Sequence, residues 1–181
     1  MKTYIRYTLL CLFALSSALC GAEVTCKSQN FQSLTTSKKI EFNSPTNTIG
    51  TTDFVTYTCS GGAKFGTGTE SGNEIAIYLE SNNNAQVTTT RIQNLDHIIV
   101  TYLPASDVNL PQVAISTNGV DGWIDLTPVK ITTTSKEYNV PSVGDYYVRI
   151  KRNSANTYIK VLEYCCLDLS GCPNCFLYKP E

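Results

Sequence analysis

The clearest pattern in this chain is an alternation of apolar and polar residues between positions 112 and 164. Three segments in this block, QVAIS, YYVRI and TYIKVLEY, carry β-branched or aromatic residues at every second position. A period of two indicates strands that bury one face. Asn118-Gly119, Asp121-Gly122 and Gly144-Asp145 supply residues that tight turns favour. The block therefore predicts consecutive antiparallel strands, and the rest of the chain is interpreted around it.

Shorter runs of the same kind precede this block. A weak strand is expected at 38–42, and stronger ones at 54–59 and 74–80. The polar run 85–92 is expected at a sheet edge, and the apolar run 98–103 at a sheet centre. No segment shows a sustained helical period, while glycine and proline recur between the runs. The sequence thus predicts an all-β fold, an antiparallel β-sandwich of the jelly-roll type with a short Cys-rich C-terminal tail.

The first residues have the features of an export signal. Lys2 and Arg6 precede an apolar stretch at 7–19, and small residues follow it. This stretch is shorter than the ~20 residues of a spanning helix, so we expect a signal peptide at 1–22. Acylation of Cys20 is the alternative, although Leu19 stands where a small residue is expected. The β-sandwich is assigned to 23–164, the tail to 165–181, and the protein to the exterior or the cell surface.

The charge balance narrows the classes of partner. The full chain has a formal net charge of −1, and loss of Lys2 and Arg6 with the signal makes it more negative by two. Nucleic-acid binding is not expected, because phosphates require a basic surface. No second apolar run follows the signal, so no integral membrane segment is expected.

Cysteine usage points to disulfides. Two of the eight cysteines lie in the signal, and an exported protein with six remaining favours bridges among them. We expect a Cys26–Cys59 bridge, with the other bridges inside the tail or from tail to body. Adjacent side chains on a strand point to opposite faces, so Cys165 and Cys166 should reach different partners. The candidates are Cys26, Cys59, Cys165, Cys166, Cys172 and Cys175.

The C-terminal cysteines have two alternatives to structural disulfides, redox exchange and zinc binding. Cys172 and Cys175 form a CxxC, whose spacing also suits zinc together with Cys165 or Cys166. Disulfides are preferred in an oxidising compartment, so neither a metal nor a cofactor is predicted.

Catalytic signatures are weak. His97 is the single histidine and follows Asp96, but no nucleophile motif accompanies it, and a histidine at a strand start is expected. Asp121 and Asp125 flank Trp123 and are candidates for the acid pair that glycoside hydrolysis needs. Asp121 belongs to an Asp-Gly turn, however, so a protein that is not an enzyme is predicted.

A ligand-binding face is predicted on the last two strands of the block. On the first strand, Tyr147, Arg149 and Lys151 share the face opposite Val148 and Ile150, and on the second Tyr158 and Lys160 share one face. If the two strands are neighbours, Tyr147, Arg149, Tyr158 and Lys160 form one polar and aromatic surface. Such a surface suits a sugar ring, and the competing interpretation is an ordinary solvated sheet face.

The order of motifs resembles a known family. Ser116-Thr117-Asn118-Gly119 precedes Trp123, a Tyr-Val-Arg-Ile strand follows at 147–150, and a strand of the type Ile-x-x-x-Glu closes the block at 159–163. This succession resembles the galactose-binding-like and carbohydrate-binding-module-type jelly rolls of exported proteins from Bacteroidetes-like bacteria, over residues 27–164. The resemblance implies a packing role for Trp123. Lys160 stands where related modules often have a calcium-ligating Asp, so calcium is not expected.

Three functions follow from these features. The first is an exported, non-catalytic module that recognises a glycan or another surface ligand. The second is a structural or adhesin-type surface protein that acts through protein contacts, with its Cys-rich tail against a partner. The third is a carbohydrate-active enzyme. The sequence leaves the ligand and the oligomeric state open.

Overall fold

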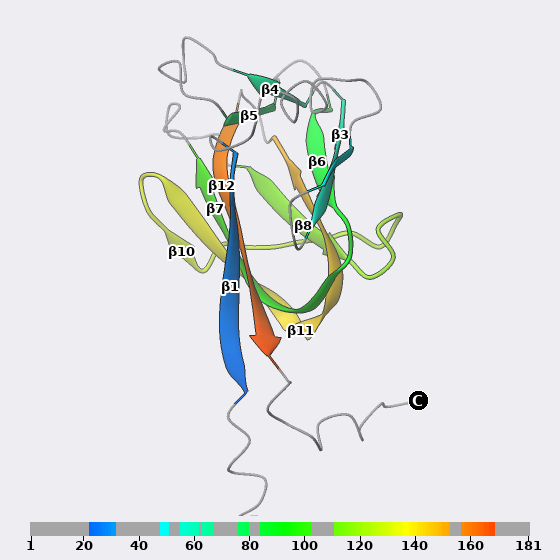
Figure 1. Ribbon diagram of the computed structural model, residues 1–181, viewed down its shortest axis with the longest axis vertical. Coiled ribbons are helices and arrows are strands. Elements are labelled where there is room, and N and C mark those ends of the chain that lie inside the picture. The colour runs from blue at the N-terminus through cyan, green and yellow to red at the C-terminus, as the bar shows by residue number, and fades with distance from the viewer. Residues whose placement is uncertain are drawn as a thin grey trace, which may run out of the picture. The chain divides into compact units, whose positions relative to one another are not determined.

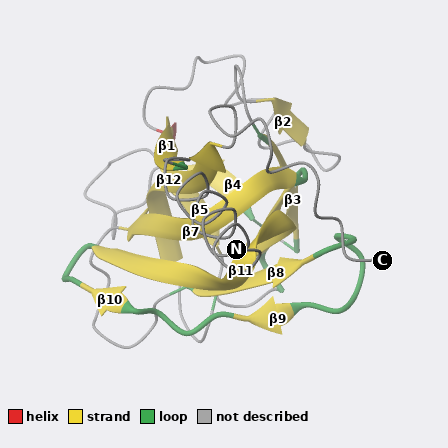
Figure 2. Ribbon diagram, turned by 90° about the horizontal axis from the view of Figure 1, so that it is seen from below, coloured by secondary structure: helices red, strands yellow, loops and turns green. Residues whose placement is uncertain are grey.

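The described residues of this computed structural model are 22–31, 48–50, 55–61, 63–66, 76–79, 84–102, 111–152 and 157–168. They form strands and contain no α-helix (Figures 1 and 2). The described strands are β1 (Glu23–Asn30), β2 (Thr48–Gly50), β3 (Thr56–Ser60), β4 (Lys64–Gly66), β5 (Ala76–Leu79), β6 (Gln86–Thr89), β7 (Ile92–Tyr102), β8 (Gln112–Ser116), β9 (Ile124–Asp125), β10 (Lys130–Ile131), β11 (Ser135–Lys151) and β12 (Thr157–Asp168).

Within residues 26–166 the strands form two antiparallel sheets that share β11. Sheet A runs β10, β11, β7, β12, β5 and β4, whereas sheet B contains β2, β3, β6, β11, β8 and β9. β1 pairs with β12. Figure 2 shows the long strand β11 passing from β10 at one end to β8 at the other. The predicted all-β, antiparallel β-sandwich is confirmed.

A corner in β11 lets one strand serve both sheets. Its pairing with β7 is interrupted between Asn139 and Gly144, where Pro141 has no N–H to donate to a neighbouring strand. Asp145 ties the corner to β7, because its carboxylate accepts a hydrogen bond from the Asn94 N–H at 3.0 Å and lies 2.9 Å from Arg91. Residues 147–151 can then pair with β8.

The core lies between the sheets and is built from alternating side chains. On β11 Val148 and Ile150 are fully buried, and on β8 so are Val113 and Ile115. The alternation predicted for 146–151 is therefore confirmed. On β12 it fails after Ile159, because an irregularity in the pairing with β7 between Ile159 and Val161 shifts the phase. Leu162 and Tyr164 are buried instead of Val161.

Of two strand positions expected from the sequence, the one for β7 is confirmed and the one for β6 is wrong. β7 lies between β11 and β12, so the central position expected for 98–103 is confirmed for its described part. The edge position expected for 85–92 is wrong, because β6 lies between β3 and β11. Its polar residues Gln86 and Thr88 are accommodated on the outer face, where an interior strand can still meet water.

The disulfide also differs from the prediction. Cys26 is bonded to Cys165, with an S–S distance of 2.05 Å, while Cys59 is a buried free thiol. The expected Cys26–Cys59 bridge is therefore wrong. Cys59 lies on the core face of β3, whereas Cys26 is on β1, which pairs with β12. Cys165 has a disulfide partner, whereas Cys166 carries a free thiol, so the expectation that both would reach partners holds for Cys165 alone.

Some sequence-based expectations lie outside the described residues. They include the signal residues 1–21 with Cys20, the weak strand 38–42, and Cys172 with Cys175. β12 continues to Asp168, so Cys165 and Cys166 lie on this strand. Among the residues that the structure describes, there is no helix long and apolar enough to cross a membrane.

Candidate functional site

The outer face of sheet B carries an ordered row of polar side chains. In the register of the sheet, Lys151 on β11 lies between Gln86 of β6 and Gln112 of β8. Ser60 of β3 lies opposite Gln86 and extends the row. Directly opposed residues in an antiparallel sheet point to the same face, so these four side chains share one surface. Because alternate residues of each strand fill the core, this surface is left for polar groups.

A second row lies next to the first. Arg149 is two residues before Lys151 and is placed between Thr88 of β6 and Ala114 of β8. Residues two apart on a strand point the same way, about 7 Å apart. Arg149 and Lys151 are therefore neighbouring cations on the outer face of sheet B.

An open pocket of about 610 Å³ lies over these rows. It is formed where β3 ends, β6 and β8 begin, and β11 ends. Its described lining residues are Ser60, Gly61, Asn84, Ala85, Gln86, Gln112, Arg149, Lys151 and Arg152. Gly61 has a φ of +62°, and a Cβ there would overlap the carbonyl oxygen of Asn84. The close approach of these two backbones at the pocket therefore requires glycine.

The loop after β8 is held by side-chain hydrogen bonds. The Ser116 hydroxyl accepts from the Gly119 N–H at 3.1 Å and donates to the Asp121 carbonyl at 2.6 Å. The Asn118 side-chain oxygen accepts from the N–H groups of Val120 and Asp121 at 2.9 and 3.1 Å. Side chains that bond nearby backbone N–H groups define such turns. The Ser-Thr-Asn-Gly motif thus fixes a loop that leads directly to Trp123.

Trp123 lies on the surface beside the pocket and not in the core. It is half-buried, and its indole N–H donates to the Val120 carbonyl at 3.2 Å. The Arg149 guanidinium carbon lies 4.2 Å from the centroid of the Trp123 ring, which is a cation–π arrangement. Trp123 is therefore not a core residue, and the packing role expected for it in the core is wrong. The core at this end is already filled by aliphatic residues of β8 and β11.

The four residues predicted as one ligand-binding face are divided between the sheets. Tyr147 and Arg149 lie on the sheet B part of β11, and Tyr158 and Lys160 lie on β12 of sheet A. β7 separates the two strands within sheet A, so the predicted adjacency does not occur. The structure brings Tyr147 against Gly119 and Arg149 over Trp123.

The two β12 members of the predicted set have different surroundings. Tyr158 is 5% exposed and stacks on Tyr78 of β5, with ring centroids 4.9 Å apart. Lys160 is half-buried. Tyr158 therefore offers little surface to a ligand in this conformation, and the role predicted for these two residues stays a prediction.

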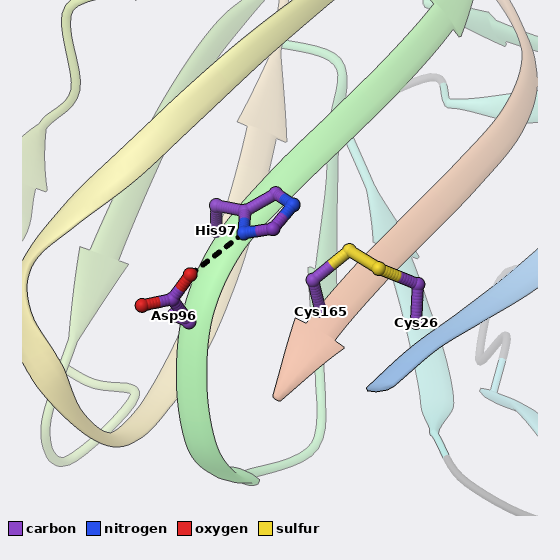
Figure 3. A network of polar contacts seen from close by, with 4 residues as sticks. All are labelled: Cys26, Asp96, His97 and Cys165. Atoms are coloured by element: carbon purple, nitrogen blue, oxygen red, sulfur yellow. Dashed lines mark hydrogen bonds and ion pairs between the residues drawn. A yellow bond between two sulfur atoms is a disulfide. The ribbon is translucent and has the colours of Figure 1, made fainter. Parts of the chain in front are cut away.

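His97 belongs to a separate cluster next to the disulfide. Its Nδ1 lies 2.7 Å from an Asp96 carboxylate oxygen (Figure 3). A ring nitrogen and the sulfurs of Cys26 and Cys165 lie within 4.8 Å of one another, a grouping of metal-ligand type. The two sulfurs are bonded to each other, however, and metals bind thiolates. In this oxidised state the cluster is a disulfide with a neighbouring imidazole.

The acidic pair considered for hydrolysis is not arranged across the pocket. A side-chain oxygen of Asp121 accepts a hydrogen bond from the Asn118 amide, within the loop. Asp125 lies on β9 opposite Ala114 and is exposed. Neither residue is among the described lining residues of the pocket.

Sequence reasoning missed most of the residues that line the pocket. Gln86, Gln112 and Ser60 look like ordinary strand-end polar residues, and they meet only because the ends of β3, β6, β11 and β8 lie side by side. The alternation along β11 was the available signal, since it placed Arg149 and Lys151 on one outward face. The sequence did not predict that β6 and β8 flank β11, which is the strand order that brings Gln86 and Gln112 next to Lys151.

Comparisons with known proteins give weak similarities. No protein-family model and no curated protein sequence matches this chain. It is similar to a family two carbohydrate esterase from Cellvibrio japonicus, with 9% identity and a TM-score of 0.43, over 80% of this chain and 34% of that one. It thus spans only about a third of the esterase.

Two further solved structures are matched over nearly their whole length. One is the K2 cleaved adhesin domain of Lys-gingipain, with 12% identity, a TM-score of 0.45, and coverage of 77% of this chain and 99% of that one. The other is the family 32 carbohydrate-binding module of NanJ from Clostridium perfringens in complex with galactose, with 10% identity, a TM-score of 0.35, and coverage of 78% and 93%. These similarities are too weak to assign a function to this chain.

Proposed function

We propose that this protein is an exported, non-catalytic β-sandwich module that binds a glycan on the outer face of sheet B. The observation that carries the proposal is an open pocket lined by amide, hydroxyl and cationic side chains, one of which, Arg149, contacts the half-buried Trp123 ring. Sugars present apolar ring faces and many hydroxyls, so an aromatic surface next to hydrogen-bonding groups is complementary to them.

The pocket supplies both halves of these hydrogen bonds. The amides of Gln86 and Gln112 can each donate and accept, and the Ser60 hydroxyl can do the same. Arg149 and Lys151 only donate. A sugar hydroxyl is itself a donor and an acceptor, so this mixture suits several hydroxyls along a chain of sugars. The open shape leaves room for a polymer to continue beyond the pocket.

Binding without catalysis is the role that these groups favour. Hydrolysis of a glycoside needs two carboxylates across the bond that is cleaved, and the described lining residues of the pocket are neutral or cationic. His97 is hydrogen-bonded to Asp96 beside a disulfide on β12 and does not line the pocket. Export is proposed from the N-terminal residues 1–22, and the Cys26–Cys165 bridge fits an oxidising compartment.

A second function is favoured by a different surface. Ile124, Val129 and Ile131 are 54%, 59% and 60% exposed along the segment that contains β9 and β10. Apolar side chains gathered on a surface can mark a protein contact. An adhesin-type role through this segment is therefore the alternative to glycan binding.

Affinity electrophoresis of the full-length protein against immobilised polysaccharides tests the proposal. We expect retardation by at least one polysaccharide and a loss of about tenfold or more in affinity for Trp123→Ala and for Gln112→Ala. Lys160→Ala is the matched control, since it removes a cationic side chain of sheet A that is not among the described lining residues of the pocket.

Two other results would contradict a glycan site on sheet B. Loss of binding in Lys160→Ala with none in Trp123→Ala would transfer the site to sheet A, as the sequence first predicted. The absence of binding to every polysaccharide tested, with partner capture lost in Val129→Glu, would support the adhesin-type role instead.

A further inference from the structure

The pocket on sheet B concentrates positive charge on a chain that has a formal net charge of −1. Arg149, Lys151 and Arg152 follow one another at the end of β11, and all three line the pocket. No carboxylate occurs among its described lining residues. In the row that contains Arg149, the acidic Asp125 lies two strands away, beyond Ala114. Neighbouring strands are about 4.8 Å apart, so Asp125 is roughly 10 Å away along the sheet.

Arg149 is also held in place before any ligand arrives. Its guanidinium lies over the Trp123 ring at 4.2 Å, and its buried Nε has no hydrogen-bond partner among the described residues. The fixed, planar guanidinium is suited to two parallel hydrogen bonds with the oxygens of one anionic group.

From these observations we propose that the ligand is an acidic saccharide, whose carboxylate or sulfate is bound by Arg149 and Lys151. This inference rests on the proposed glycan binding and specifies the chemistry of the same site. The acidic group meets the two cations, while Gln86, Gln112 and Ser60 bind hydroxyls of the same or the next sugar. A neutral sugar supplies no negative charge to Arg149 and Lys151 and binds more weakly.

Two matched pairs of polymers test the charge requirement. Dextran sulfate is compared with dextran, and polygalacturonate with its methyl ester, using the full-length protein at low and at physiological salt. We expect the acidic member of at least one pair to bind at least tenfold more tightly, and this preference to shrink as salt is raised. The pair that shows the preference distinguishes sulfate from carboxylate.

Variants locate the preference in the pocket. Arg149→Met and Lys151→Met should each weaken binding of the acidic polymer roughly 10- to 100-fold, the range for hydrogen bonds to charged groups. Binding of the neutral partner should change little in Lys151→Met. Lys130→Met is the control, because it removes one positive charge from an exposed position on β10. Arg149→Met also removes the contact with Trp123, so a loss of binding in that variant could come from a displaced Trp123 ring. Lys151→Met tests the charge without removing that contact.

Several results would overturn the inference. Equal binding to the acidic and the neutral polymer of each pair would show that an acidic group is not required. If Trp123→Ala still weakened binding in that case, the proposed glycan binding would stand. Equal loss in Lys130→Met would indicate general charge attraction. Binding of double-stranded DNA as tightly as the acidic polymer would indicate a surface for polyanions in general. Failure to bind any polysaccharide would overturn the proposed function together with this inference.

Discussion

The guanidinium carbon of Arg149 lies 4.2 Å from the centroid of the Trp123 ring. This contact joins the pocket at the end of β11 to the hydrogen-bonded loop that follows β8. Both residues are half-buried, so the pair forms part of the surface of sheet B and not of the core. Since Trp123 is the only tryptophan of the chain, its fluorescence reports on this pair directly.

The first prediction concerns that fluorescence. The native protein should emit as a partly exposed indole, and Arg149→Ala should move the emission further to the red as the ring gains water. The free energy of unfolding should fall by only about 1 kcal/mol, the scale of a surface cation–π contact. Lys160→Ala should leave the spectrum unchanged. Emission typical of a fully buried indole would contradict the arrangement of Trp123.

The second prediction concerns two glycines of the same loop. Gly119 and Gly122 have φ values of +75° and +59°, so alanine strains the backbone at either position, by about 1 to 2 kcal/mol. A Cβ at Gly119 would also lie 2.8 Å from the Tyr147 ring, whereas a Cβ at Gly122 meets nothing within 4 Å. Urea unfolding should therefore show Gly119→Ala to be the more destabilising, by roughly another 1 to 3 kcal/mol.

A double variant isolates the contribution of the tyrosine. With Tyr147→Ala in place, the extra cost of Gly119→Ala over Gly122→Ala should largely disappear, because the ring that the new methyl group meets is gone. An unchanged difference between the two alanine variants would show that Tyr147 is not the cause.

The alternation along β11 shows what the sequence could and could not predict. It correctly placed Val148 and Ile150 inward and Arg149 and Lys151 outward, because the period of two is a local property. It could not show that β11 leaves sheet A and enters sheet B at the corner between Pro141 and Asp145. The partner of Tyr147 and Arg149 is consequently β8 rather than β12.

The errors at Trp123 and Cys26 have the same origin. Both depend on contacts between segments far apart in sequence, 139 residues apart for Cys26 and Cys165. For Cys26, the even number of cysteines after the expected signal favours a disulfide but does not select the partner, since six cysteines permit fifteen pairings. Trp123 could be core or surface until the aliphatic residues that fill the core were known.

The third prediction concerns alkaline pH. Burial raises the pKa of Tyr57, Tyr138 and Tyr164 above the usual value of 10. The unfolded chain then loses these protons at a lower pH than the native protein does. Above pH 10 the native state therefore holds more protons, and its free energy of unfolding should fall as pH rises, by up to about 1.4 kcal/mol per pH unit for each such tyrosine.

Spectrophotometric titration of tyrosinate together with urea unfolding checks this result. The three buried tyrosines should ionise only as the protein unfolds. Tyr138→Phe should lessen the dependence on pH, although it also removes the hydrogen bond to the Pro111 carbonyl at 3.0 Å. Tyr146→Phe is the control, because Tyr146 is only half-buried. Smooth ionisation of all tyrosines in the folded protein would contradict the burial.

The last prediction concerns the Cys26–Cys165 bridge, which closes a long loop because its cysteines are 139 residues apart. Crosslinking restricts the unfolded chain, so Cys26→Ala with Cys165→Ala should lower the free energy of unfolding by about 2 to 5 kcal/mol. Cys166→Ser is the control, since Cys166 has a free, half-buried thiol whose pKa burial raises to about 11. It should cost less than about 1 kcal/mol. Peptide mapping without reductant should recover Cys26 joined to Cys165 and Cys59 as a free thiol, and a Cys26–Cys59 peptide would refute this pairing.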